Sequence, residues 1–192
     1  VMLMGLLTPG ALARSGKGTH FITLCQLQAQ LHFLSRGRHS AQPQQHKVLA
    51  SRGECDALAR GDLQALQDAA KKHSICVVLG VSELDSQFSG TTLFNTVVVI
   101  GPDGEMLNRH RKLMPTNLER MIWGPGDGSG LRVVDTPAGR LGTLICWEAY
   151  MPLARYALYA QGIDIFVVPT WDTSETWIAS MRHIAMEGGC WV

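Results

Sequence analysis

Apolar residues in this chain gather in short runs that have the length of β-strands and are separated by polar stretches. Several runs are almost continuously apolar, which is typical of strands covered on both faces. A Pro-Asp-Gly sequence at residues 102–104 predicts a turn that joins two of the runs as a hairpin. The predicted strands cover residues 75–81, 93–100, 105–109, 132–135, 141–146 and 163–169, and residues 190–192 begin another.

Three other segments have apolar residues at helical spacing. The first ends in two lysines, whose charge suits the carboxyl end of a helix, and the second opens with a proline. The third follows Thr173 or Ser174 as its cap and ends at two glycines. The predicted helices cover residues 54–72, 151–160 and 173–187, with a loop over 114–130. Alternating strands and helices predict an α/β domain with helices outside a sheet core.

Charge is distributed unevenly along the chain. Residues 1–53 contain six Lys or Arg and no Asp or Glu, whereas the other 139 residues carry a net charge of −5. A basic arm for an anionic partner is one interpretation. The alternative, which we favour, is an atypical basic segment that is poorly ordered, because no helical or strand period persists in it. We therefore expect residues 1–53 to stand apart from a domain that covers residues 54–192.

The composition narrows the class of protein. With 192 residues and 46% apolar composition, the chain is long enough for one substantial core. A charged fraction of 17% and a net charge of +1 do not favour a nucleic-acid binder or a membrane-surface protein. Five cysteines without a CxxC pair argue against a disulfide framework or a zinc site and favour a reducing cytosol. The apolar start lacks the basic leading segment of a signal peptide, so a cytoplasmic protein is expected.

Two side chains at predicted strand ends are candidates for chemistry. Cys146 follows an apolar run and precedes Pro152, which indicates a strand, a sharp turn carrying the thiol, and a helix. A helix N-terminus facing the sulfur would favour the thiolate. The alternative is that Cys146 is only a small buried hydrophobe. Lys112 leaves the end of the strand predicted over 105–109, which is a rigid position for an ammonium group.

The runs around these two residues resemble the nitrilase superfamily of carbon–nitrogen hydrolases, in particular its true nitrilase branch. The resemblance covers roughly residues 54–192. It rests on HRKLMPT at 110–116, ER at 119–120, WG at 123–124, CWE at 146–148, YMPL at 150–153, PT at 169–170 and MRHIAMEG at 181–188. It implies an α-β-β-α sandwich of the nitrilase type, incomplete here because full-length family members continue past residue 192.

The resemblance also implies the chemistry. Cys146 would attack the carbon of a nitrile to form a thioimidate and then an acyl-enzyme, with ammonia leaving between them. Lys112 would stabilise the developing negative charge and lower the pKa of the thiol. Glu119 matches the family's auxiliary Glu, which positions the Lys and the substrate; the alternative is an exposed loop carboxylate paired with Arg120. No metal or organic cofactor takes part.

The chain departs from the family pattern at the general base. That Glu lies several dozen residues before the Lys in the family, which here falls within residues 1–53, where there is no carboxylate. Glu54 and Glu83 lie too near Lys112 to replace it. Glu148 matches a family position, but we interpret it as a buried partner for an Arg or for a backbone donor rather than as a catalytic group.

Three aromatic residues, Trp147, Tyr150 and Trp171, are candidates for contact with the substrate. For Trp147, packing under the nucleophile turn is an equally good interpretation. Nitrilases usually have Asn or His where this chain has Ala149, so the substrate preference does not transfer. His183 is predicted to be a hydrogen-bonded core histidine. The predicted helix over 151–160 resembles a family dimer interface, so a homo-oligomer is expected.

These observations favour a nitrilase acting on a small-molecule nitrile, with no nucleic-acid or membrane partner. An amidase or a cyanide-hydrolysing enzyme is the related alternative. The missing general base favours a different class of answer, an inactive family member truncated at both ends that keeps the fold. An N-acyltransferase is a weaker idea, because nothing in the sequence indicates an acceptor site.

Overall fold

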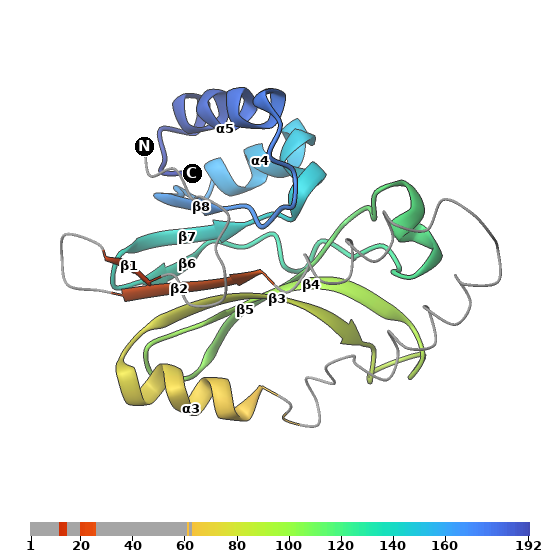
Figure 1. Ribbon diagram of the computed structural model, residues 1–192, viewed down its shortest axis with the longest axis vertical. Helices are drawn as coiled ribbons and strands as arrows, with labels where there is room; N and C mark the ends of the chain where they lie inside the picture. The colour runs from red at the N-terminus through yellow and green to blue at the C-terminus, as the bar shows by residue number, and fades with distance from the viewer. Residues whose placement is uncertain (1–11, 15–19, 26–60, 62) are drawn as a thin grey trace.

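The computed structural model describes residues 12–14, 20–25, 61 and 63–192, and two β-sheets lie at its centre (Figure 1). The first sheet has the strand order β1-β2-β3-β4-β5 and the second has the order β6-β7-β8. The strands are β1 (Leu12–Arg14), β2 (His20–Cys25), β3 (Cys76–Leu84), β4 (Leu93–Ile100), β5 (Met106–Arg111), β6 (Val134–Thr136), β7 (Gly139–Thr143) and β8 (Ile165–Val167). The helices are α3 (Gln64–His73), α4 (Pro152–Tyr159) and α5 (Glu175–Gly188), with 3-10 helices η2 (Asn117–Met121) and η3 (Cys146–Tyr150).

The two sheets pack face to face between helical layers. In Figure 1, α3 covers the outer side of the first sheet, and α4 and α5 cover the outer side of the second. Three apolar clusters fill the layers. One lies between the sheets (Val78, Val97, Val99, Leu141, Ile145), one lies under α3 (Ala70, Val77, Val98, Ile100), and one lies under α4 and α5 (Leu158, Phe166, Trp177, Ile184). The expected α-β-β-α sandwich is therefore confirmed, with partial sheets.

Strand pairing explains how the chemistry-bearing segments come together. β3, β4 and β5 form an antiparallel meander in which Val97 pairs with His110, and Lys112 follows directly at its end. β7 pairs in parallel with β8, so the segments that follow both strands leave the same edge of the second sheet. Cys146 lies in the first of those segments and Thr170 in the second.

Most predicted elements are present, with shifted ends. The strands over 75–81 and 93–100 are confirmed as β3 and β4, and the helix over 173–187 is confirmed as α5. The Oγ of Ser174 caps α5 by accepting from the backbone N–H of Trp177. The helix predicted over 54–72 is observed as α3, and residues 54–60 lie outside the described residues.

Two expectations need correction. The segment 1–53, for which the sequence indicated no regular element, supplies β1 and β2, and β2 joins the sheet as a parallel neighbour of β3. The rest of that segment lies outside the described residues. The strand predicted over 141–146 ends at Thr143, and the chain then passes into η3. In both cases the structure depends on contacts with residues that are distant in the sequence, and a local sequence pattern does not report such contacts.

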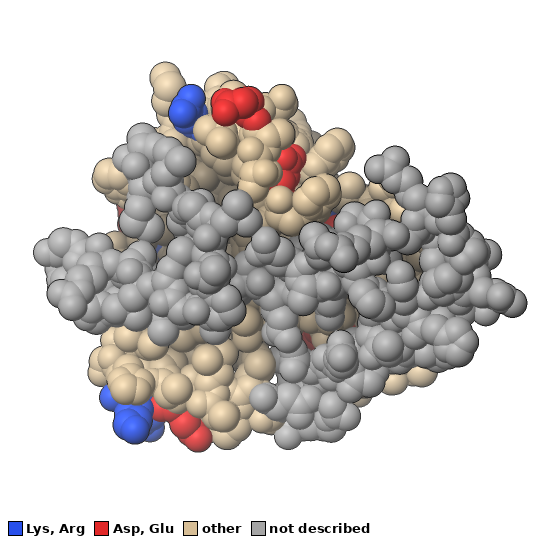
Figure 2. Space-filling view, in the orientation of Figure 1, with Lys and Arg blue, Asp and Glu red and all other residues tan. Residues whose placement is uncertain are grey.

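The described surface carries charges of both signs. In Figure 2 basic and acidic side chains lie side by side near α3 and again near α5. Those of α3 are exposed and include Asp68, Lys71 and Lys72. Among the described residues, none of the helices has the length and apolar character needed to cross a membrane.

Candidate active site

Cys146 occupies a sharp turn after β7. Its backbone has φ 53°, a conformation that non-glycine residues rarely adopt, and its N–H donates to the carbonyl oxygen of Pro169 at 2.9 Å. The hydroxyl of Thr170 donates to Sγ at 3.2 Å. The thiol is only 2% exposed. Cys146 therefore lies on a turn as predicted, and a strained backbone held by the segment after β8 directs its sulfur.

Lys112 is the fully buried cation of the site, with 0% exposure. Its backbone N–H donates to the carbonyl of Asn95, and its own carbonyl accepts from Gly126, each at 2.8 Å. Its ammonium donates to Glu119 Oε2 at 2.7 Å and to Thr116 Oγ1 at 3.1 Å. A buried charge needs such partners, because desolvation otherwise disfavours the charged form.

Glu119 lies in η2 and is 4% exposed. The same oxygen that binds Lys112 also accepts the backbone N–H of Thr116 at 2.7 Å. The alternative of an exposed carboxylate paired with Arg120 is wrong, because Glu119 is buried and Arg120 donates instead to the carbonyl of Pro115. Glu119 thus contacts the ammonium group of Lys112, and its role as the auxiliary Glu stays a prediction.

Electrostatics connect the thiol to this ion pair. Burial raises the pKa of the Cys146 thiol, while the hydroxyl of Thr170 and the charge of Lys112 act to lower it. The charge of Glu119 raises the same pKa. The ammonium charge therefore acts on the thiol. The expected lowering effect of Lys112 on the thiol pKa is present, but desolvation outweighs it together with the Thr170 contact, so the net pKa is raised.

Glu148 joins the two segments that carry Lys112 and Cys146. Its Oε1 accepts the backbone N–H of Leu113 and its Oε2 accepts that of Ile145, each at 2.6 Å. The ring Nε2 of His110 lies 3.1 Å and 3.0 Å from the two oxygens. The expected backbone donors to Glu148 are thus present, and its side-chain partner is a histidine rather than an arginine.

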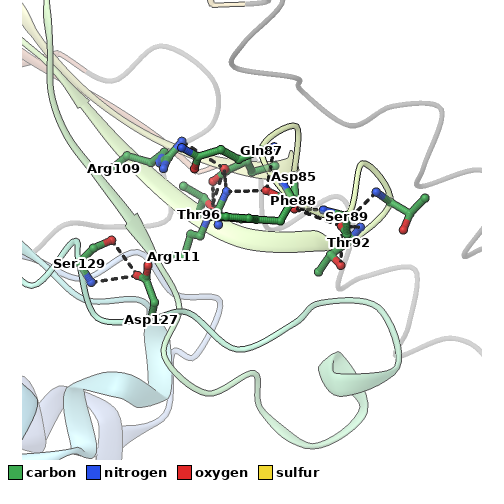
Figure 3. A network of polar contacts seen from close by, with 12 residues as sticks. Asp85, Gln87, Phe88, Ser89, Thr92, Thr96, Arg109, Arg111, Asp127 and Ser129 are labelled. Carbon is green, nitrogen blue, oxygen red and sulfur yellow. Dashed lines mark hydrogen bonds and ion pairs between the residues drawn. The ribbon is translucent and has the colours of Figure 1, made fainter.

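A second polar network holds β5 from its opposite face. Arg111 lies between the carboxylates of Glu83 and Asp85, and Thr96 donates to Glu83 at 2.7 Å. Figure 3 shows Arg111, Thr96 and Asp85 of this network. The guanidinium also lies 3.9 Å from the centre of the Phe94 ring. These contacts fix the strand end from which Lys112 emerges.

Asp85 lies at one end of this network and shapes the loop that follows β3. Its carboxylate accepts the backbone N–H groups of Gln87, Phe88 and Ser89, as Figure 3 shows. The bond from Ser89 is the largest cause that lowers the pKa of Asp85, to about 2. The carboxylate therefore stays ionised down to acidic pH and keeps the turn closed.

The three predicted substrate-contacting aromatics differ in burial. Trp147 is 55% exposed and Trp171 is 56% exposed, whereas Tyr150 is half-buried. Trp147 meets Tyr150 edge to face at 5.6 Å, and its exposure does not favour the interpretation that it packs under the turn. Contact of these rings with a substrate stays a prediction. His183, predicted to be a core residue, is exposed on α5.

A cavity of about 480 Å³ lies beside η2 and does not include the thiol. It is lined by Thr91, Thr92, Leu93, Met114, Pro115, Arg120, Ile122, Trp123, Gly124 and Pro125. None of the six residues predicted for catalysis or substrate contact lines it. We place the candidate chemistry at Cys146, Lys112 and Glu119 because charge, burial and hydrogen bonding converge there.

Sequence reasoning gave no role to three of the supporting residues, Thr116, Thr170 and His110, which appeared only within the motifs that carry the resemblance. A signal for His110 was available, because it stands two positions before Lys112 at the end of a strand and so shares its face. Thr170 has no comparable local signal. It contacts Cys146 only because β7 and β8 are neighbours.

Comparisons with known proteins identify the family of this chain. The profile of the carbon-nitrogen hydrolase family matches residues 21–192. The chain therefore belongs to the carbon–nitrogen hydrolase family. The match to this family begins well before residue 54, where the sequence resemblance was expected to start.

Among named relatives, the chain is similar to plant nitrilases. Over 131 residues it is 52% identical to Nitrilase 1 of Arabidopsis thaliana, covering 68% of this chain and 37% of that protein. It is 51% identical to a bifunctional nitrilase/nitrile hydratase of Lupinus angustifolius, covering 68% of this chain and 36% of the relative. The chain thus spans little more than a third of the length of these relatives.

Solved structures share the fold. The yeast Saccharomyces cerevisiae Nit3, a nitrilase superfamily member, aligns with a TM-score of 0.59 and 25% identity over 67% of this chain and 47% of its own. A carbon-nitrogen hydrolase from Helicobacter pylori aligns with a TM-score of 0.57 and 23% identity over 68% of this chain and 49% of its own. The carbon–nitrogen hydrolase sandwich is therefore the fold of the described domain.

Proposed function

We propose that this protein is a nitrilase, which hydrolyses a small-molecule nitrile to a carboxylic acid and ammonia. The observation that carries the proposal is the buried ion pair of Lys112 and Glu119, whose charges act on the thiol of Cys146. The identity of about one half to plant nitrilases supports nitriles as the substrate class.

The proposed reaction uses side chains alone. The sulfur of Cys146 bonds to the nitrile carbon, and one C–N π bond becomes an N–H bond to give a thioimidate. Water adds to the thioimidate and ammonia leaves, which forms a thioester. A second water releases the carboxylic acid and restores the thiol. Lys112 stabilises negative charge on the nitrogen, and Glu119 holds the ammonium in place.

The raised pKa of the Cys146 thiol makes a proton acceptor necessary. The thiol is the resting form near neutral pH, so a base must take its proton before attack. Glu119 is engaged by Lys112 and Thr116. Residues 1–53, where the family resemblance expects the base, contain no Asp or Glu.

This departure supports a second candidate, a chain with the fold but impaired or absent turnover. Loss of a general base typically costs about 10²- to 10⁴-fold in rate. Adding an N-terminal segment that carries the family's Glu should then raise the rate of nitrile hydrolysis sharply. An unchanged rate would count against the idea that the missing base limits the reaction.

The test of the nitrilase proposal is ammonia release from a panel of nitriles and from the amides of the same acids. We expect turnover of nitriles that disappears in Cys146→Ala and persists in Cys190→Ala, which removes another buried free thiol. Turnover of amides alone would refute the nitrile assignment and favour an amidase. Equal rates in Cys146→Ala and in the unchanged protein would exclude the thiol as nucleophile.

We also propose that the protein forms a homo-oligomer through α4. Met151, Leu153 and Tyr156 expose apolar surface at the start of this helix, with Leu153 83% exposed. Light scattering after size exclusion should report more than one protomer. Leu153→Glu should shift the mass toward the monomer, and an unchanged mass would place the interface elsewhere.

A cytoplasmic location is the remaining part of the proposal. Three cysteines of the described part, Cys76, Cys146 and Cys190, are free thiols, which suits a reducing compartment. Fractionation of cells that express the tagged protein would test this location.

A further inference from the structure

We infer that Glu148 is a positioning residue that sets the placement of Lys112 relative to Cys146 by bonding the backbone beside each of them. The inference rests on the proposed function for its catalytic meaning. It adds a residue that is neither the proposed nucleophile, Cys146, nor a member of the Lys112–Glu119 ion pair.

The position of the two backbone bonds supports the inference. The Leu113 N–H belongs to the residue directly after Lys112, and the Ile145 N–H belongs to the residue directly before Cys146. The two bonds, each 2.6 Å long, end on the two oxygens of one carboxylate. A rigid planar group of atoms therefore spans the gap between the two catalytic segments.

His110 completes the set of partners. Its Nε2 lies within 3.1 Å of both oxygens, and both side chains are fully buried. Within the part of the chain that the structure describes, its Nδ1 has no hydrogen-bond partner, so the ring hydrogen is assigned to Nε2, where the carboxylate can accept it. The carboxylate of Glu148 therefore accepts N–H groups from Leu113, Ile145 and His110.

The same contacts favour a structural role for Glu148 over proton transfer. A carboxylate has about four lone-pair sites on its two oxygens. Three donors already point at them: the Leu113 N–H at Oε1, the Ile145 N–H at Oε2, and the single Nε2–H of His110, which both oxygens share. Each of these donors would lose an acceptor if Glu148 took a proton, so we assign the residue to positioning.

Glu148→Gln tests the inference with little change in volume. The amide keeps one acceptor oxygen and places an N–H₂ group against either the Leu113 or the Ile145 N–H, where two donors then meet. One of the two backbone bonds is lost in either orientation. The segment carrying Lys112 is then free to move relative to the thiol. Glu105→Gln, at an exposed carboxylate in the β4–β5 turn, is the matched control.

The first readout is the pH dependence of Cys146 alkylation by iodoacetamide, followed at that cysteine by peptide mass spectrometry. Because the charge of Lys112 lowers the pKa of the thiol, Lys112→Met should move the profile to higher pH. We expect Glu148→Gln to move it in the same direction and to add little in the Lys112→Met background. Glu105→Gln should leave it unchanged.

This readout needs no turnover, so it separates the inference from the proposed function. A profile that Glu148→Gln leaves unchanged, or shifts equally with and without Lys112, would overturn the inference. If Glu148→Gln does not fold, as judged by circular dichroism, His110→Asn takes its place. That variant removes one donor and should give a smaller shift in the same direction; no shift would again overturn the inference.

The second readout applies if the protein hydrolyses nitriles. Misplacing catalytic groups by about 1 Å can cost about 10²-fold in rate. We therefore expect Glu148→Gln to lower kcat by about 10²-fold with little change in KM, and to keep the acid limb of the kcat/KM profile. Disappearance of that limb would make Glu148 the base and overturn its positioning role.

Discussion

Replacing Lys112 by methionine would leave the carboxylate of Glu119 buried without its cation. The two side chains are 0% and 4% exposed and meet at 2.7 Å, so water screens them little. Removing one partner of such a pair typically costs about 3–5 kcal/mol of folding free energy. In a chain of this size, about 1 kcal/mol corresponds to about 2–4 °C in Tm, so a loss of about 6–20 °C is expected.

The double variant Lys112→Met/Glu119→Gln should be more stable than Lys112→Met alone. The amide oxygen of the new glutamine can still accept the Thr116 N–H, and no charge remains buried without a partner. The effects of the two substitutions are therefore expected to be strongly non-additive.

Urea unfolding followed by circular dichroism measures the free energies, with Lys72→Met on the exposed side of α3 as the control. The control should stay within about 0.5 kcal/mol of the unchanged protein. A loss below about 1 kcal/mol for Lys112→Met, with additive effects in the double variant, would show that the pair is not a buried one.

Three further changes test the surroundings of the site. Gly126→Ala would press a Cβ against the carbonyl at the end of β5, and should lower the free energy of unfolding in urea by about 3 kcal/mol. The control, Gly90→Ala, lies in open space at φ +64° and should lower it by only about 1 kcal/mol. Equal losses in the two variants would refute the close approach at Gly126. The pKa of Asp85, about 2, lies below its unfolded value of about 3.9, so the stability it contributes is present above pH 4 and lost as pH falls toward 2. Thermal unfolding from pH 5 to pH 2 should show a smaller decline for Asp85→Asn, and parallel curves would contradict this. Arg155→Met removes hydrogen bonds to the carbonyl of Ala149 in η3 and to the carboxylate of Glu187 on α5, and should lower the free energy of unfolding by about 1–2 kcal/mol. Arg182→Met, at an exposed position, is the control. Equal losses in the two variants would argue that Arg155 does not join η3 to α5.

Local pattern was enough for the elements that bury a continuous apolar surface. β3 and β4 were predictable because most residues in each are apolar and almost all are buried, with α3 packed on one face and the second sheet on the other. The exposure of His183 was not, because Ile184 beside it is buried and one position along a helix turns the side chain by about 100°. Helix residues next to the buried stripe are therefore the least certain part of a sequence prediction.

The sequence by itself determined the order of most strands and helices after residue 60, the place of Lys112 at a strand end and the place of Cys146 on a turn. Those features depend on residue types close together in the chain, whose spacing sets burial and turn formation. Only the tertiary structure decided that Thr170 touches the sulfur, that Glu119 is buried against Lys112 and that Glu148 bonds both catalytic segments. Each of these contacts depends on how strands pair within a sheet and how the sheets pack, and long-range packing of that kind leaves no periodic signal in the sequence.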